Sequence, residues 1–241
     1  MRAEVGLRTR REGEIQLHQI SIFSFRMDGK KTKEAFLQQA VESYCCKIGF
    51  GNPEDSSWEV RKTEKGKPFF VNQPGRYLSV TDSGRTRMIA LGDCLVGIDL
   101  QLPETRGGKN RIREEQCQVL ASRWFHPEES CWITRAADFQ PEDGRCVQKS
   151  LQRINSGTGM FSGVTGRFFQ VWTGKEAYVK YTGSGIDGNF SRFSVLDPAL
   201  PAVLSWFAVR AEDREGREKD ALLCVCTGEK TEIHMQRTWK R

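Results

Sequence analysis

The sequence of 241 residues lacks any long apolar run. Its longest uncharged apolar stretch, residues 198–209, falls well short of the roughly 20 residues that a helix needs to cross a bilayer. The basic residues near its beginning are not followed by the apolar segment of a secretory signal. We therefore expect no membrane partner and a chain that stays in the cytoplasm.

Cysteine is present, but not at the spacing of a metal or redox motif. None of the 8 cysteines belongs to a Cys-x-x-Cys pair; Cys45 and Cys46 are adjacent, and Cys224 and Cys226 alternate as residues of a strand do. This spacing argues against a zinc site or a redox dithiol. We interpret most of the thiols as small buried apolar groups in a reducing compartment.

The composition excludes disordered and collagen-like classes, because 38% of the residues are hydrophobic, 28% are charged and only 23 are glycine. No internal repeat is present. The length allows one large domain or two small lobes. A formal net charge of +6 is modest, and it favours an anionic partner such as a nucleic acid, a phosphorylated cofactor or an acidic protein.

Hydrophobic periodicity predicts a mixture of strands and helices. Strands are expected at residues 20–25, 58–60, 77–80, 88–91, 95–100, 192–196, 203–209, 221–226 and 232–236. Helices are expected from Thr32 to about Gly49, at residues 112–125, just after Pro127, and at residues 167–181. Because strands and helices do not alternate as repeated βαβ units, the fold class is α+β.

Two pairs of polar residues could carry chemistry. Asp99 and Gln101 lie on one face of an otherwise apolar strand, and Glu176 and Lys180 lie four residues apart on the most regular helix. Carboxylate and amide oxygens suit Mg²⁺, and a neighbouring lysine suits a phosphorylated ligand. The ordinary alternatives are a strand-end hydrogen bond for Asp99 and a solvated ion pair for Glu176 and Lys180.

A series of motifs over residues 66–195 resembles the 4'-phosphopantetheinyl transferases of the surfactin-synthetase-activating type. The motifs, in order, are Gly66-Lys67-Pro68-Phe69, Thr81-Asp82-Ser83-Gly84, Val96-Gly97-Ile98-Asp99, Trp124-Phe125-x-x-Glu128-Glu129, Trp172-Thr173-x-Lys175-Glu176-x-x-x-Lys180 and Gly183-x-Gly185. The combination of the Asp99 strand with the Glu176 helix is specific, whereas Gly-Lys-Pro or Gly-x-Gly alone is weak.

The resemblance implies two similarly folded α+β lobes, a pseudo-dimer, with the active site in the cleft between them. It places an N-terminal lobe at residues 15–95 and a C-terminal lobe with the metal site at residues 96–241. The polar residues before them predict a flexible basic N-terminus at residues 1–14. A fused pair of lobes leads us to expect a monomer.

The resemblance also implies a reaction. A serine of an apo acyl or peptidyl carrier protein attacks coenzyme A, takes the 4'-phosphopantetheine arm and releases adenosine 3',5'-bisphosphate, with Mg²⁺ as cofactor. Asp99 and Glu176 match the metal ligands, Glu176 or a metal-held water takes the serine proton, and Lys180 meets the pyrophosphate charge. The positions that match the nucleotide site are Lys67, Pro68, Thr81, Asp82 and Lys175.

Two positions depart from the family pattern. Asp82 stands where a histidine usually helps to bind the 3'-phosphate, and Gln101 stands where many members carry a third acidic metal ligand. Either other cations hold the 3'-phosphate or coenzyme A binds more weakly here. The candidate cations are Lys30, Lys31, Arg85 and Arg87.

Two rival functions remain open. The first is a degenerate family member that binds coenzyme A with little transferase activity, because of Asp82 and Gln101. The second is a basic protein that binds single-stranded nucleic acid, favoured by the positive charge and by aromatic residues on strands. Because 31 acidic residues are interspersed with 37 basic ones, we expect no nucleic-acid partner.

Overall fold

The computed structural model describes residues 17–49, 58–102, 114–134, 163–185 and 189–238. The predicted flexible segment 1–14 and Cys146 lie outside these residues. The elements, in order, are β1 (Gln19–Arg26), α1 (Lys33–Ile48), β2 (Val60–Lys62), β3 (Pro68–Phe70), β4 (Tyr77–Ser83), β5 (Thr86–Gly92), β6 (Val96–Gln101), α2 (Glu114–Trp124), α3 (Pro127–Thr134), α5 (Gly163–Thr182), the 3₁₀ helix η3 (Asn189–Arg192), β7 (Val203–Glu212), β8 (Glu218–Thr227) and β9 (Glu232–Arg237).

The strands form a four-stranded sheet in the order β4-β5-β1-β9, a three-stranded sheet in the order β6-β8-β7, and a small β2-β3 ribbon. Pairing is antiparallel except between β1 and β9, which run parallel. The mixed α+β class predicted from the sequence is therefore confirmed. Among the described residues, no helix has the length and apolar character of a membrane span.

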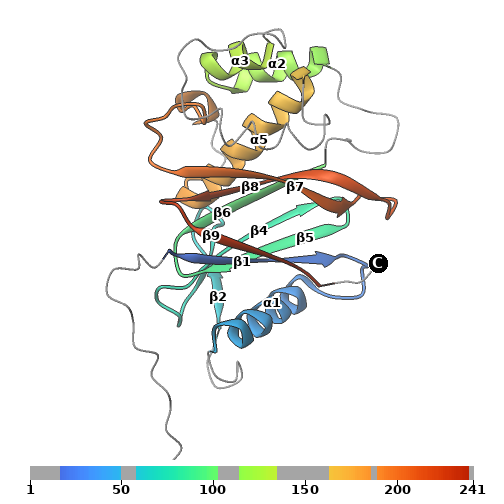
Figure 1. Ribbon diagram of the computed structural model, residues 1–241, viewed down its shortest axis with the longest axis vertical. Helices are drawn as coiled ribbons and strands as arrows, with labels where there is room; N and C mark the ends of the chain where they lie inside the picture. Colours follow the sequence, from blue (N-terminus) through green and yellow to red (C-terminus); the bar gives the residue numbers. More distant parts are fainter. Residues whose placement is uncertain (1–16, 50–57, 103–113, 135–162, 186–188, 239–241) are drawn as a thin grey trace, which may run out of the picture.

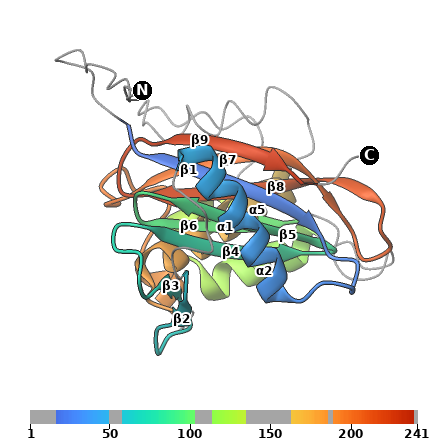
Figure 2. The same ribbon diagram turned by 90° about the horizontal axis from the view of Figure 1, so that it is seen from below.

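The two larger sheets lie face to face between layers of helices, with α1 on one side and α2, α3 and α5 on the other (Figure 1). The core between the sheets contains Ile20, Ile22, Ile98 and Leu223. Figure 2 shows α1 crossing the outer face of the four-stranded sheet, where Phe36 belongs to a second core with β1 and β5 residues. Each long helix thus covers the outer face of one sheet.

Helix α1 begins and ends where the sequence predicts. The side chain of Thr32 accepts a hydrogen bond from the backbone N–H of Ala35, which satisfies a free donor of the first turn. Gly49 ends the helix in the left-handed conformation, with φ of 65°. The predictions for β1, β4 to β9 and α5 are likewise confirmed within a few residues.

The strand predicted at residues 192–196 is wrong. The 3₁₀ helix η3 ends at Arg192, and the following residues form no strand. Their backbone groups bond to side chains from distant elements: the N–H of Val195 donates to Glu129, and the carbonyl of Phe193 accepts from Lys175. These contacts replace the ladder that a strand needs.

Strand β6 and helix α5 approach each other unusually closely, because Gly97 has no side chain. A Cβ atom there would lie 2.0 Å from the carbonyl oxygen of Ala177 and 2.4 Å from the backbone nitrogen of Tyr181. Any larger residue would push the helix away. This contact fixes the distance between the side chains of β6 and those of α5.

The two sheets are also joined edge to edge by side chains. Strand β6 is an edge strand of its sheet. The outward N–H groups of Ile98 and Leu100, and that of Leu102 just after the strand, need partners. Alternate hydroxyls of β4 supply them: those of Ser79, Thr81 and Ser83 accept these three hydrogen bonds at 3.0–3.1 Å. Residue 81 is thereby held beside residue 99.

Candidate functional site

Asp99 lies at the centre of a hydrogen-bond network between β4, β6 and α5. It is 3% exposed. Its Oδ1 accepts from Lys180 Nζ at 2.7 Å and from the Thr81 hydroxyl at 3.2 Å, and its Oδ2 accepts from the Gln101 amide at 3.2 Å. Burial raises the pKa of Asp99, and the cation of Lys180 opposes that rise.

Glu176 lies one helical turn before Lys180 on α5 and is 7% exposed. Burial, followed by the negative charge of Asp99, raises the pKa of Glu176 from 4.5 to about 7. Lys180 partly opposes the shift. A carboxylate with this pKa can accept a proton near neutral pH, as a general base must.

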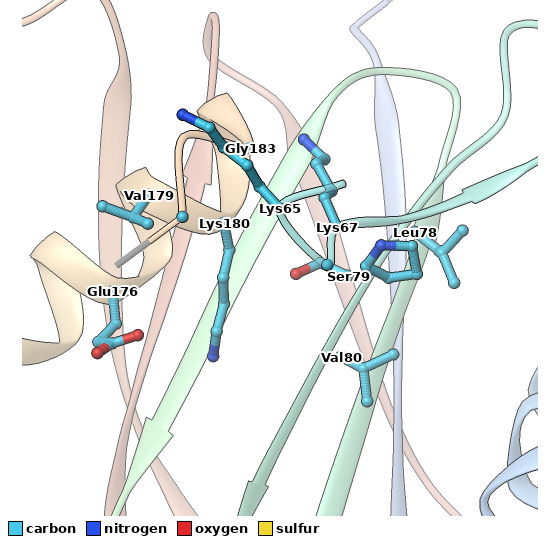
Figure 3. A pocket seen from close by; sticks show the side chains of 12 residues that line it. Lys65, Lys67, Leu78, Ser79, Val80, Glu176, Val179, Lys180 and Gly183 are labelled. Carbon is cyan, nitrogen blue, oxygen red and sulfur yellow. The ribbon is translucent and has the colours of Figure 1, made fainter. Parts of the chain in front are cut away.

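A cavity of about 290 Å³ lies beside this network (Figure 3). Its walls come from the β2–β3 turn, from β4 and from the last turns of α5. The charged side chains that line it are those of Lys65, Lys67, Glu176 and Lys180. With three lysines and one carboxylate, the cavity suits an anionic ligand such as a phosphate ester.

Lys67 connects the β2–β3 turn to the end of α5. Its ammonium donates a hydrogen bond to the carbonyl of Tyr181, and burial lowers its pKa. Gly183 makes room for it, because a Cβ there would lie 2.9 Å from Lys67 Cδ. Pro68 also lines the cavity.

Lys175 is not brought to this cavity. Its side chain is fully buried, and its Nζ lies 2.8 Å from Glu129 Oε2 and donates to the carbonyls of Phe190 and Phe193 at 2.5 and 2.6 Å. The ring centroid of Phe193 lies 4.1 Å away. Lys175 therefore anchors the segment around η3 and α3 to helix α5.

The residues expected near the 3'-phosphate do not line the cavity. Asp82 forms a two-point ion pair with Arg87, at 2.7 and 2.6 Å, so its negative charge is already balanced. The side chain of Lys31 donates to Gln39. Neither Lys30 nor Lys31 lines the cavity. Arg85 donates to the carbonyl of Met27.

Sequence reasoning assigned no role to Lys65 or to Glu129, although Glu129 belongs to one of the quoted motifs. Lys65 lines the cavity, yet it lies in a turn where no periodicity indicates its direction. Glu129 is fully buried and bonds Lys175, His126 and Val195. Two adjacent glutamates directly after Pro127 indicate a helix N-terminus, because an acidic side chain is stabilised there.

Comparisons with known proteins identify relatives of this chain. A model of the 4'-phosphopantetheinyl transferase superfamily matches residues 95–221. A protein of Synechocystis sp., whose name makes it a candidate 4'-phosphopantetheinyl transferase, is 28% identical over 131 residues. The match covers 53% of this chain but 41% of the relative, so the chain spans about two fifths of that protein. The family match includes Asp99, Gln101, Glu176 and Lys180.

Proposed function

Because this chain belongs to the 4'-phosphopantetheinyl transferase superfamily, we propose that it transfers the 4'-phosphopantetheine arm of coenzyme A to a serine of an apo carrier protein. The carrier is an acyl or a peptidyl carrier protein, and the second product is adenosine 3',5'-bisphosphate. The motifs over residues 66–195 favour the surfactin-synthetase-activating type. The observation that carries the proposal is the meeting of Asp99, Glu176 and Lys180 beside a lysine-lined cavity.

In the proposed reaction, the serine oxygen forms a bond to the β-phosphorus of coenzyme A, and the bond from that phosphorus to the bridging oxygen breaks. Glu176, or a water held by the bound metal, accepts the proton of the serine hydroxyl. Lys180 stabilises the charge that grows on the departing bisphosphate. Lys65 and Lys67 hold the other phosphate oxygens in place.

The donor set at this site fits Mg²⁺. Two carboxylates, Asp99 and Glu176, interact unfavourably in a largely buried place, and a divalent cation would relieve that repulsion. Asp99, Glu176 and the amide oxygen of Gln101 would hold the ion. When bound, it would polarise the phosphoryl group and neutralise charge in the transition state. In the structure described here, Lys180 supplies the positive charge beside Asp99.

We further propose two lobes of similar fold, divided near residue 95, with residues 15–95 and 96–241 as their extents. In support, each half contributes a long helix on the outer face of a sheet, α1 in one and α5 in the other. Strand β9 returns to the sheet of the first half. We propose that the protein acts as a cytoplasmic monomer.

The cations that could hold the 3'-phosphate need revision. Asp82 is balanced by Arg87, so it repels a phosphate less than an unpaired carboxylate would. We propose that Lys65 and Lys67, which line the cavity, do more of the phosphate binding than Lys30 and Lys31. Thr81 serves Asp99 and Leu100 instead of a phosphate.

The test is mass spectrometry of an apo carrier protein incubated with the full chain, coenzyme A and Mg²⁺. We expect the mass of the phosphopantetheine arm to appear on the carrier. Asp99→Asn and Glu176→Gln should abolish transfer with the fold intact, while Glu215→Gln, on the exposed β7–β8 turn, should leave it unchanged. If the chain binds coenzyme A but transfers nothing, it is a degenerate family member. If it binds single-stranded nucleic acid but neither binds coenzyme A nor transfers the arm, it is a nucleic-acid-binding protein.

A further inference from the structure

Three segments far apart in the sequence bring metal-ligating side chains together beside the start of β1. His18 precedes β1, Asp93 and Cys94 connect β5 to β6, and Glu229 connects β8 to β9. A ligand atom from each of His18, Asp93 and Cys94 lies within 4.8 Å of the other two. His18 Nδ1 is 3.2 Å from Asp93 Oδ1, and His18 Nε2 is 3.0 Å from Glu229 Oε1.

We propose that this cluster binds one Zn²⁺ through His18 Nδ1, the Asp93 carboxylate and the Cys94 thiolate, with water as a fourth ligand. Imidazole nitrogen, thiolate sulfur and carboxylate oxygen form a donor set typical of zinc. Magnesium requires oxygen ligands, which this cluster does not offer in sufficient number. The site is therefore chemically distinct from the one at Asp99 and Glu176, and it does not depend on the proposed transferase activity.

The spacing of the cluster is close to what zinc needs. Tetrahedral coordination at zinc bond lengths separates a nitrogen ligand by about 3.3 Å from an oxygen and about 3.5 Å from a sulfur. The nitrogen–oxygen pair, at 3.2 Å, already meets this requirement. The other pairs, within 4.8 Å, need to close by about 1.3 Å at most. The side chains of His18 and Asp93 are 42% and 34% exposed, so an ion can enter and the residues can shift.

Glu229 supports the assignment of Nδ1 as the ligand. A histidine that binds a metal through one ring nitrogen usually donates its other N–H to a carboxylate, which fixes the tautomer and turns the ring. Glu229 Oε1 lies 3.0 Å from Nε2, within reach of that N–H. Glu229 would thus orient the ring from the side away from Asp93.

A metal here would tie the start of β1 to the connection between β5 and β6. Asp93 and Cys94 lie on the connection between the four-stranded and three-stranded sheets, and His18 and Glu229 precede β1 and β9. No Cys-x-x-Cys spacing predicts the site, because its ligands come from separate segments. We infer a stabilising role instead of a catalytic one.

The test uses the full chain in magnesium-free buffer with a phosphine reductant, and it uses Co²⁺ and Zn²⁺ alone as probes. One Co²⁺ per chain should give a thiolate-to-cobalt charge-transfer band. Cys94→Ser should remove the band, while Cys46→Ser, a matched change at an exposed thiol on α1, should keep it. Zn²⁺ should raise the thermal midpoint of the wild type but not that of Cys94→Ser.

Affinities give a second, graded readout. His18→Gln should weaken Zn²⁺ binding by on the order of 100-fold, and Glu229→Gln by about 10-fold. The proposal is overturned if no charge-transfer band forms, if the band survives in Cys94→Ser, or if Cys46→Ser removes it. In those cases His18, Asp93 and Glu229 form an ion-pair network that holds three loops without a metal.

Discussion

Among the described residues, Lys180 provides the only cation that contacts Asp99. A nearly buried carboxylate needs such a partner, because ionisation in a desolvated place is costly. Lys180 is less buried, with 30% of its side chain exposed, and it also lines the cavity. The same lysine can therefore balance Asp99 before a ligand arrives and meet phosphate charge afterwards.

Lys180→Ala should lower kcat by on the order of 100-fold or more and weaken coenzyme A binding much less. The reason is that charge on the departing bisphosphate is greater in the transition state than in the bound substrate. Steady-state kinetics and direct binding of coenzyme A measure the two effects separately. As a comparison, Lys65→Ala should act mainly on KM. A loss in Lys180→Ala confined to KM would make Lys180 a ground-state phosphate clamp.

Glu176 predicts a pH dependence of stability. Its pKa is about 7 in the folded chain against an ordinary 4.5, so between these values the folded chain holds a proton that the unfolded chain has lost. The free energy of unfolding should therefore fall, by about 3 kcal/mol, as the pH rises from about 4.5 to about 7 in metal-free buffer. Urea unfolding with a chelator tests this. Glu176→Gln should remove this dependence of the free energy of unfolding on pH. If the variant keeps the same pH dependence as the wild type, the raised pKa of Glu176 is contradicted.

Gln101→Glu should raise the affinity of the free protein for Mg²⁺ by on the order of tenfold, about 1.4 kcal/mol. The amide of Gln101 now donates to Asp99, and a carboxylate at that position would repel Asp99 until a cation binds. The coupling between Mg²⁺ and coenzyme A binding should shrink accordingly. Calorimetric titration with and without coenzyme A measures both. Unchanged Mg²⁺ affinity would mean that residue 101 does not face the ion.

At the scale of elements, the ion pair of Lys175 and Glu129 fixes how α3 and η3 sit against α5. Both side chains are fully buried, and their remaining hydrogen-bonding capacity is used by backbone groups. Burial lowers the pKa of Lys175 and raises that of Glu129, while their mutual attraction opposes both shifts. Removing either charge alone leaves the other buried without a partner.

Lys175→Met should lower the free energy of unfolding by about 3–5 kcal/mol, and combining it with Glu129→Gln should restore part of the loss. Coenzyme A binding per folded molecule should stay close to that of the wild type, since Lys175 does not line the cavity. Chemical denaturation and calorimetric titration measure these quantities. If Lys175→Met is stable but fails to bind coenzyme A, Lys175 belongs to the nucleotide site after all.

The same region shows what the sequence could and could not predict. Residues 20–25 and 167–181 have strong periodicity, so their strand and helix follow from local pattern. Residues 192–196 have an apolar pattern too, but their backbone groups bond to Lys175 and Glu129, which are far away in the chain. Spacing aligned Asp99, Glu176 and Lys180 with family motifs. It could not predict that Lys175, next to Glu176, bonds Glu129 instead of lining the cavity.

At the scale of the whole molecule, the candidate site depends on contacts between the two halves. Thr81 from β4 bonds both Asp99 and the backbone of β6, and Lys67 from the β2–β3 turn bonds the end of α5. A shift of one sheet against the other would therefore change the hydrogen bonds of Asp99 and the shape of the cavity together. The hydroxyl ladder of β4 prevents such a shift, because each buried N–H that lost its partner would be costly.

The parallel pairing of β1 with β9 has a consequence for protein synthesis. Gln19 and Glu232, neighbours in that pairing, are 213 positions apart in the chain. During synthesis, β1 and β5 leave the ribosome long before β9 has been translated. Until then, the N–H and C=O groups on one edge of β1 lack their strand partner. During that interval the nascent chain is exposed to wrong strand pairing. Chaperone dependence in cells should therefore track the rate at which the second half is translated.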